Sequence, residues 1–96
     1  VYAATKSAQM NFVQTMAREL AGFGITVNNI APGVILTPRN EEALSDDEYK
    51  AKVYSNIPCG YAGIAEDIAP ATLLLCSDEG RYITGTDIII DGGMHL

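Results

Sequence analysis

The stretch ELAGFGITVNNIAPG, residues 19–33, predicts a helix end, a short strand and a turn in immediate succession. Gly22 and Gly24 follow a run of helix formers and are typical of a helix C-terminus. The β-branched residues within 25–30 predict a strand, and Pro32-Gly33 predicts a break directly after it. A helix that runs into a short buried strand is half of a β-α-β unit, so we expect a parallel sheet.

The segment upstream, residues 2–21, predicts a long helix. Good helix formers dominate it, among them Ala, Gln, Met, Lys, Arg, Glu and Leu. Its apolar residues recur at steps of three and four, which predicts one buried stripe. This stripe would consist of Met10, Val13, Met16, Ala17 and Leu20.

A second helix and a second strand are expected near the other end of the chain. Residues 66–77 predict the helix, with Pro70 in the first turn, where a missing N–H costs little. Residues 85–90 predict the strand, whose three consecutive isoleucines suit burial on both faces. The buried face of the helix would consist of Ile68, Ala71, Leu74 and Leu75.

Between these two halves the hydrophobic pattern weakens and negative charge accumulates. Five of the twelve acidic residues fall within 41–48. Ser45-Asp46-Asp47-Glu48 is typical of a helix start, with Ser45 as the cap. We interpret residues 38–58 as a substrate-loop region that carries a short, polar, mobile helix over a site. A solvated surface helix without such a role is the alternative.

The amino-acid composition and net charge exclude several classes of protein. A chain with 48% hydrophobic and 19% charged residues is typical of a folded α/β domain. The net charge of −6 argues against nucleic-acid binding, and the apolar stretches are too short to cross a membrane. Cys59, Cys76 and one histidine do not make a metal site, so we expect no metal and two reduced thiols in a cytoplasmic protein.

Tyr2 and Lys6 form the first candidate for chemistry. Four residues apart on a helix, they share one face. Two unit charges about 4 Å apart at an effective dielectric of about 20 interact by about 4 kcal/mol, or about three pKa units. One lysine can therefore bring a tyrosine near the pH range in which a proton-transfer group works best.

Several short motifs occur in one order along almost the whole chain. They are YAATKSA at 2–8, GITVNNIAPG at 24–33, Thr37, EDIA at 66–69, YITG at 82–85 and DGG at 91–93. Together they resemble the C-terminal part of the short-chain dehydrogenases/reductases. The resemblance implies the last two strands, with their helices, of a Rossmann-like doubly wound parallel sheet.

The resemblance also implies roles for individual residues in an NAD- or NADP-dependent oxidoreductase. Tyr2 matches the catalytic acid/base, and Lys6 matches the residue that tunes it and binds the nicotinamide ribose. Pro32-Gly33 matches the turn against which the nicotinamide lies. Ile35 matches the residue whose backbone bonds the carboxamide, and Thr37 matches a hydroxyl that contacts the carboxamide or the pyrophosphate. The matches of Asn28, Asp67 and Asp91 are structural.

Three local features narrow the resemblance further. Tyr61 in IPCGYAG (57–63), TPRN (37–40) and DGGM (91–94) resemble bacterial glucose 1-dehydrogenases. That likeness implies an alcohol substrate that is a sugar such as glucose, with Asn40 in contact with it. A 3-oxoacyl or general ketone reductase of the same family is the alternative. A non-enzymatic remnant that acts as an interaction module is another.

The glycine-rich first turn of the family has no counterpart in the chain. Gly22-x-Gly24 follows a helix and so does not fit a dinucleotide fingerprint. We therefore expect residues 1–96 to be the C-terminal fragment of one longer domain, inactive and poorly stable alone. The resemblance implies a homotetramer for the complete protein, and the choice between NAD and NADP stays open.

Overall fold

The computed structural model describes all 96 residues, Val1–Leu96. The chain divides into two compact units, residues 1–30 with 71–88 and residues 31–70 with 89–96. Helices dominate, and two short strands follow the first and the last of them. In chain order the elements are α1 (Tyr2–Leu20), the 3₁₀ helix η1 (Ala21–Phe23), β1 (Asn29–Pro32), α2 (Pro38–Leu44), α3 (Asp47–Ser55), α4 (Ala65–Cys76), the 3₁₀ helix η2 (Asp78–Gly80) and β2 (Asp87–Ile90).

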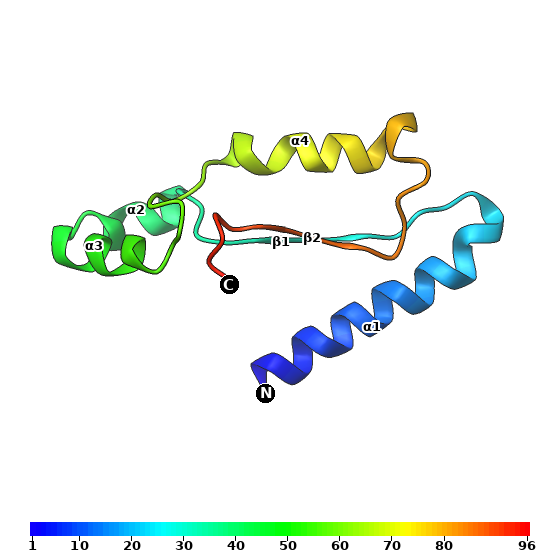
Figure 1. The fold of residues 1–96 in the computed structure, drawn as a ribbon, viewed down its shortest axis with the longest axis horizontal. Helices are drawn as coiled ribbons and strands as arrows, with labels where there is room; N and C mark the ends of the chain where they lie inside the picture. Colours follow the sequence, from blue (N-terminus) through cyan, green and yellow to red (C-terminus); the bar gives the residue numbers. More distant parts are fainter. The chain divides into compact units, whose positions relative to one another are not determined.

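The strands β1 and β2 pair with each other and run in the same direction (Figure 1). In the first unit the Asn29 N–H donates to the Thr86 carbonyl at 2.9 Å. In the second unit the Gly33 N–H donates to the Ile90 carbonyl, also at 2.9 Å. From the first of these bonds to the second, the donor on one strand and the acceptor on the other both move four residues toward the C-terminus, as in a parallel ladder. The expected parallel pairing is confirmed.

The first strand was wrongly placed by the sequence pattern, because β1 begins at Asn29 and includes Pro32. Residues 25–28 are held by other bonds: the Val27 N–H donates to the Thr84 hydroxyl at 3.1 Å instead of to a strand. Pro32 is tolerated because only alternate residues donate toward β2, and Pro32 lies between donors.

The second strand also begins later than the pattern predicted. The prediction placed its start at Gly85, but β2 begins at Asp87. Gly85 has φ of +74°, in the left-handed region that interrupts a strand and favours glycine. Its N–H still donates to the Val27 carbonyl at 2.8 Å, so the turn pairs with the segment before β1.

The core of the first unit is the apolar stripe of α1. Val13 and Ala17 are buried, and the other members of the predicted stripe are half-buried, which confirms the stripe. Gly85 packs directly on this helix, since a Cβ at Gly85 would lie 3.5 Å from the Ala17 Cβ. The helix ends at Leu20, one residue before its predicted end, where η1 continues the chain.

Helix α4 differs from the prediction in two respects. It begins at Ala65, so Pro70 is its sixth residue rather than part of the first turn, and the Glu66 carbonyl loses its helical donor. Leu74 was predicted to be buried but is 41% exposed. Ile68, Ala71 and Leu75 are half-buried and share one face of the helix, whereas Leu74 lies at the edge of this face.

In the second unit, two helices occupy the acidic segment. The sequence predicted one helix capped by Ser45, which is wrong. Asp46 caps α3: its Oδ1 accepts from the Glu48 N–H at 3.0 Å and the Tyr49 N–H at 3.4 Å. Ser45 instead follows the end of α2 and donates its hydroxyl to the Glu42 carbonyl at 2.6 Å. The core of this unit comprises the buried residues Leu44, Ile57 and Ala62.

Candidate functional site

Tyr2 and Lys6 lie in the first two turns of α1, in the first unit. The Lys6 ammonium nitrogen is 5.6 Å from the centroid of the Tyr2 ring, which is cation–π geometry. The expectation that the two side chains share one helix face is confirmed. Tyr2 is 76% exposed, so its hydroxyl is available to a bound molecule. The catalytic roles of both residues remain predictions.

The other predicted site residues, Pro32, Gly33, Ile35, Thr37 and Asn40, all belong to the second unit. The exposed Pro32 ends β1, and Gly33 follows it in close contact with β2. A Cβ added at Gly33 would lie 2.5 Å from the Asp91 Cβ and 2.7 Å from the Asp91 Cα. Only glycine therefore fits this turn without displacing the end of β2.

Ile35 and Gly63 form an isolated parallel β-bridge. The N–H and the carbonyl of Ile35 itself point away from Gly63 in this bridge. The bridge uses the Leu36 N–H, which donates to the Gly63 carbonyl at 2.8 Å, and the Gly63 N–H, which donates to the Val34 carbonyl at 2.9 Å. The Ile35 carbonyl accepts from the Asn40 side-chain amide at 2.7 Å, whereas the Ile35 N–H has no partner. This N–H is a free hydrogen-bond donor.

Thr37 supplies a second free donor. It precedes α2 in an extended conformation, and its hydroxyl makes no capping bond to the helix. Its carbonyl is engaged instead, accepting from the N–H groups of Asn40 at 2.9 Å and Glu41 at 3.1 Å. The Thr37 side chain is exposed.

A cavity of about 410 Å³ brings Gly33 and Asn40 together. The amide nitrogen of Asn40 is committed to the Ile35 carbonyl, which fixes the side chain and leaves its carbonyl oxygen unpaired. The walls come from the end of β1, from α2 and α3, and from the C-terminal turn. They are formed by Gly33, Val34, Asn40, Ala43, Leu44, Tyr49, Val53, Asn56 and Met94.

Sequence reasoning did not place Tyr49, Val53, Asn56 or Met94 at a site. Tyr49, Val53 and Asn56 recur at steps of four and three along α3 and its end, and that spacing was a signal for one shared face. Met94 follows β2 in a turn, where no periodicity marks a side chain as part of a pocket.

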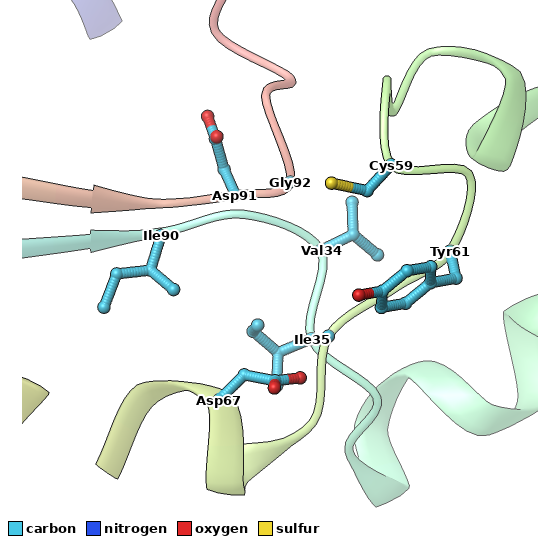
Figure 2. A pocket seen from close by; sticks show the side chains of 9 residues that line it. Val34, Ile35, Cys59, Tyr61, Asp67, Ile90, Asp91 and Gly92 are labelled. Atoms are coloured by element: carbon cyan, nitrogen blue, oxygen red, sulfur yellow. The ribbon is translucent and has the colours of Figure 1, made fainter. Parts of the chain in front are cut away.

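A smaller cavity of about 220 Å³ shares Val34 with the larger one (Figure 2). The Tyr61 hydroxyl points into it, and the Ile35 and Asp67 side chains lie opposite. The Asp67 carboxylate also accepts from the Ile64 N–H at 2.8 Å, which ties it to the start of α4. The cavity is lined by Val34, Ile35, Cys59, Tyr61, Gly63, Asp67, Ile90, Asp91 and Gly92.

The Asp91 carboxylate points away from this smaller cavity and organises the C-terminal turn (Figure 2). It accepts from the Gly93 N–H at 2.9 Å and the His95 N–H at 3.0 Å, and the His95 Nδ1 lies 3.0 Å away. Desolvation by itself would raise the pKa of Asp91. The hydrogen bond from the His95 side chain, the Gly93 N–H and the charge of His95 outweigh it and hold that pKa below its ordinary value of 3.8.

Two expected absences concern metals and membranes. The structure contains no group of three or more histidine, cysteine, aspartate or glutamate side chains placed to hold a metal ion. None of the helices is both long enough and apolar enough to cross a membrane. Both cysteines, Cys59 and Cys76, are free and exposed.

Comparison with known proteins finds relatives along almost the whole chain. The family described as enoyl-(acyl carrier protein) reductase matches residues 1–95. Over 95 residues, the chain is 46% identical to 3beta-hydroxysteroid dehydrogenase 1 of Eggerthella lenta, covering 99% of this chain and 36% of the relative. It is 45% identical over 95 residues to a 3-oxoacyl-(acyl-carrier-protein) reductase of Haemophilus influenzae, covering 99% and 38%.

A solved structure shares the arrangement of the elements. It is a crystal structure from Agrobacterium tumefaciens, assigned as a 2-deoxy-D-gluconate 3-dehydrogenase and holding NADP. The TM-score is 0.86 at 36% identity, covering 98% of this chain and 38% of that one. The expected fold, the last two strands and helices of a doubly wound α/β sheet, is confirmed. The chain spans little more than a third of the length of these relatives.

Proposed function

This chain belongs to the short-chain dehydrogenase/reductase family, and on that premise we propose that the complete protein is a nicotinamide-dependent oxidoreductase acting on an alcohol or carbonyl compound. The observation that carries this proposal is the Tyr2–Lys6 pair. A tyrosine with an ammonium group 5.6 Å from its ring, exposed on one helix face, is an acid/base paired with a fixed positive charge.

The residues of the second unit fit a nicotinamide cofactor, NAD or NADP. The unpaired Ile35 N–H and the free Thr37 hydroxyl are donors suited to a carboxamide oxygen or a phosphate. Pro32 is exposed and offers an apolar surface to a planar ring. Lys6 would bind the nicotinamide ribose. The solved relative that holds NADP supports this choice of cofactor.

We propose that Tyr2 takes the proton from the substrate hydroxyl. A nicotinamide held beside Lys6 would supply the hydride acceptor for the carbon that carries this hydroxyl. Tyr2 removes the hydroxyl proton in the same reaction, and in the reverse direction it returns a proton to the carbonyl oxygen. Lys6 places a positive charge beside the Tyr2 ring. The resemblance implies that Asn40, whose side chain is fixed by its bond to Ile35, contacts the substrate.

A sugar such as glucose is the substrate we favour. In the 410 Å³ cavity, Asn40 and Asn56 offer amide groups and Tyr49 offers a hydroxyl, all of which pair with sugar hydroxyls. Residues 38–56 around this cavity carry five carboxylates and three cationic side chains. That negative balance suits a neutral polyol better than an anionic substrate. The solved relative is assigned to a sugar acid, 2-deoxy-D-gluconate, which supports a polyhydroxylated substrate but not the choice of a neutral one.

A 3-oxoacyl reductase is the second candidate. Ala43, Leu44, Val53 and Met94 give the same cavity an apolar wall, which suits an acyl chain. The 45% identity to a 3-oxoacyl-(acyl-carrier-protein) reductase supports this alternative. The excess of carboxylates over cationic side chains in residues 38–56 opposes it, because the phosphate of a phosphopantetheine arm would be repelled there.

A substrate panel with the complete gene product tests the proposal. Nicotinamide absorbance is followed with glucose and NAD or NADP, and with a 3-oxoacyl thioester and NADH or NADPH. We expect glucose oxidation to give the higher kcat/KM. Turnover of the thioester alone would establish the second candidate, and no nicotinamide-linked turnover with any substrate would refute the oxidoreductase.

We also propose that the complete protein is a cytoplasmic homotetramer. The resemblance to the short-chain dehydrogenases/reductases implies this assembly. Free cysteines are typical of a reducing compartment. Light scattering coupled to size exclusion measures the assembly: four copies are expected, and a monomer would contradict it.

A further inference from the structure

Met94 is the one wall residue of the 410 Å³ cavity that comes from the C-terminal turn. The other walls come from residues 33–56. Met94 is 41% exposed, so part of its flexible thioether side chain packs on the cavity and part stays free to meet a ligand. It is therefore an apolar wall that a bound substrate would complete.

Hydrogen bonds fix the turn that carries Met94. The Asp91 carboxylate accepts from the Gly93 and His95 N–H groups, on either side of Met94. The Met94 N–H itself donates to the Asp91 carbonyl at 3.2 Å. Asp91 thus holds the residue before Met94, the residue after it and Met94 itself.

Close packing presses the same turn against the segment that follows α3. A Cβ added at Gly92 would lie 2.8 Å from the Ile57 Cγ2, and one added at Gly93 would lie 3.1 Å from the Pro58 Cβ. The Cys59 N–H donates to the Gly92 carbonyl at 3.0 Å. The turn cannot shift toward this segment, so the Asp91 bonds decide how far Met94 reaches over the cavity.

We propose that Met94 is a specificity-determining residue of the substrate pocket and that Asp91 is the positioning residue that holds it there. The inference rests on the proposed function and extends it. Met94 contacts the apolar C–H surface of the substrate in the cavity that Asn40 and Tyr49 also line. Asp91 does not itself touch the substrate. Loss of its carboxylate loosens the turn and so weakens the contact between Met94 and the substrate.

The first test replaces Met94 in the complete protein. Met94→Ala removes the wall, and we expect KM for the preferred substrate to rise about tenfold, with kcat changed less than about twofold. Met94→Leu keeps a comparable apolar volume and should bring KM back to within about threefold of the wild type. An unchanged KM in Met94→Ala would overturn the proposal.

The second test asks whether Asp91 acts through Met94. Asp91→Asn should raise KM severalfold in the wild-type background and by less than about twofold in the Met94→Ala background. If the KM increases caused by Asp91→Asn and Met94→Ala multiply in the double variant, the positioning role of Asp91 is overturned. Asp87→Asn is the matched control: Asp87 begins β2 and accepts from the Asn29 side chain at 2.8 Å, far along the strand from the turn, so KM should not change.

If Asp91→Asn fails to fold, His95→Ala takes its place. It removes the Nδ1 contact at 3.0 Å but leaves the backbone bond from His95 to Asp91 intact. KM should rise about twofold with Met94 present and stay constant in the Met94→Ala background. A rise that persists in the Met94→Ala background would overturn the positioning role.

A readout that does not depend on turnover separates this inference from the proposed function. In the protein labelled with methyl-¹³C methionine, the signal lost in Met94→Leu is assigned to Met94. Glucose, or a 3-oxoacyl thioester if only that is turned over, should shift this signal and leave the Met10 and Met16 signals of α1 unchanged. If no substrate is turned over, the proposed function fails, and the glucose titration still decides the inference. An unshifted Met94 signal overturns it.

Discussion

Gly33→Ala is the substitution whose cost follows most directly from the structure. The new Cβ would lie 2.5 Å from the Asp91 Cβ and 2.7 Å from the Asp91 Cα, whereas ordinary contact begins at 3.4 Å. These atoms belong to the backbone and to the base of a side chain, so they cannot swing aside as the end of a flexible side chain does. The ends of β1 and β2 must separate.

The magnitude has two contributions. Overpacking of a tight contact costs about 1–3 kcal/mol. Separating the strands also loses the bond from the Gly33 N–H to the Ile90 carbonyl, now 2.9 Å long, which is worth about 0.5–1.5 kcal/mol. We expect Gly33→Ala to lower the free energy of unfolding by about 2–4 kcal/mol.

Urea unfolding of the complete protein measures this change, with Gly22→Ala as the matched control. Gly22 lies in η1, has nothing within 4 Å of an added Cβ and does not have a positive φ. Its replacement should be neutral or stabilise by about 0.4–1 kcal/mol through the unfolded chain. If the two alanine variants unfold at the same urea concentration, the close approach of Gly33 to Asp91 is refuted.

Four further substitutions test the local structure through the free energy of unfolding. Asp46→Ala should cost about 1 kcal/mol by removing the cap of α3, whereas Ser45→Ala should cost less than half of that; the reverse order would contradict the capping assignment. Asn28→Ala should cost about 1–3 kcal/mol, because its amide donates to the Ile83 carbonyl at 2.9 Å and its oxygen accepts from the Thr86 N–H at 3.1 Å. The lowered pKa of Asp91 means that its stabilisation is complete above pH 3.8 and is lost as the pH falls through the lower folded-state pKa. Stability measured against pH should therefore fall less steeply in this acid range for Asp91→Asn, and identical acid limbs would exclude that contribution.

The helices were predictable because their signals are local. Helix α1 has a long stripe at helical spacing, and its buried members are those the spacing indicated. The strand starts were not predictable, because the bond from Val27 to the Thr84 hydroxyl and the left-handed Gly85 join segments far apart in sequence. β-Branched composition marks extended chain but does not show where ladder pairing begins.

The residue that caps α3 and the residues that line the cavity also depend on contacts that the local sequence does not reveal. Ser45 and Asp46 are both good caps, and only the end of α2 at Leu44 decides which one is free to cap the next helix. Asn40 was found by family resemblance. Met94 reaches the same cavity through tertiary packing of the C-terminal turn, which leaves no pattern in the sequence.

The measurement that tests the account most directly is turnover by Tyr2→Phe in the complete protein. The substitution removes only the hydroxyl of a side chain that is 76% exposed, so folding should not change. We predict that kcat falls by about 10²–10⁴-fold, while the nicotinamide Kd stays within about twofold of the wild type. Near-normal turnover by Tyr2→Phe would contradict the proposed role of Tyr2 as the acid/base.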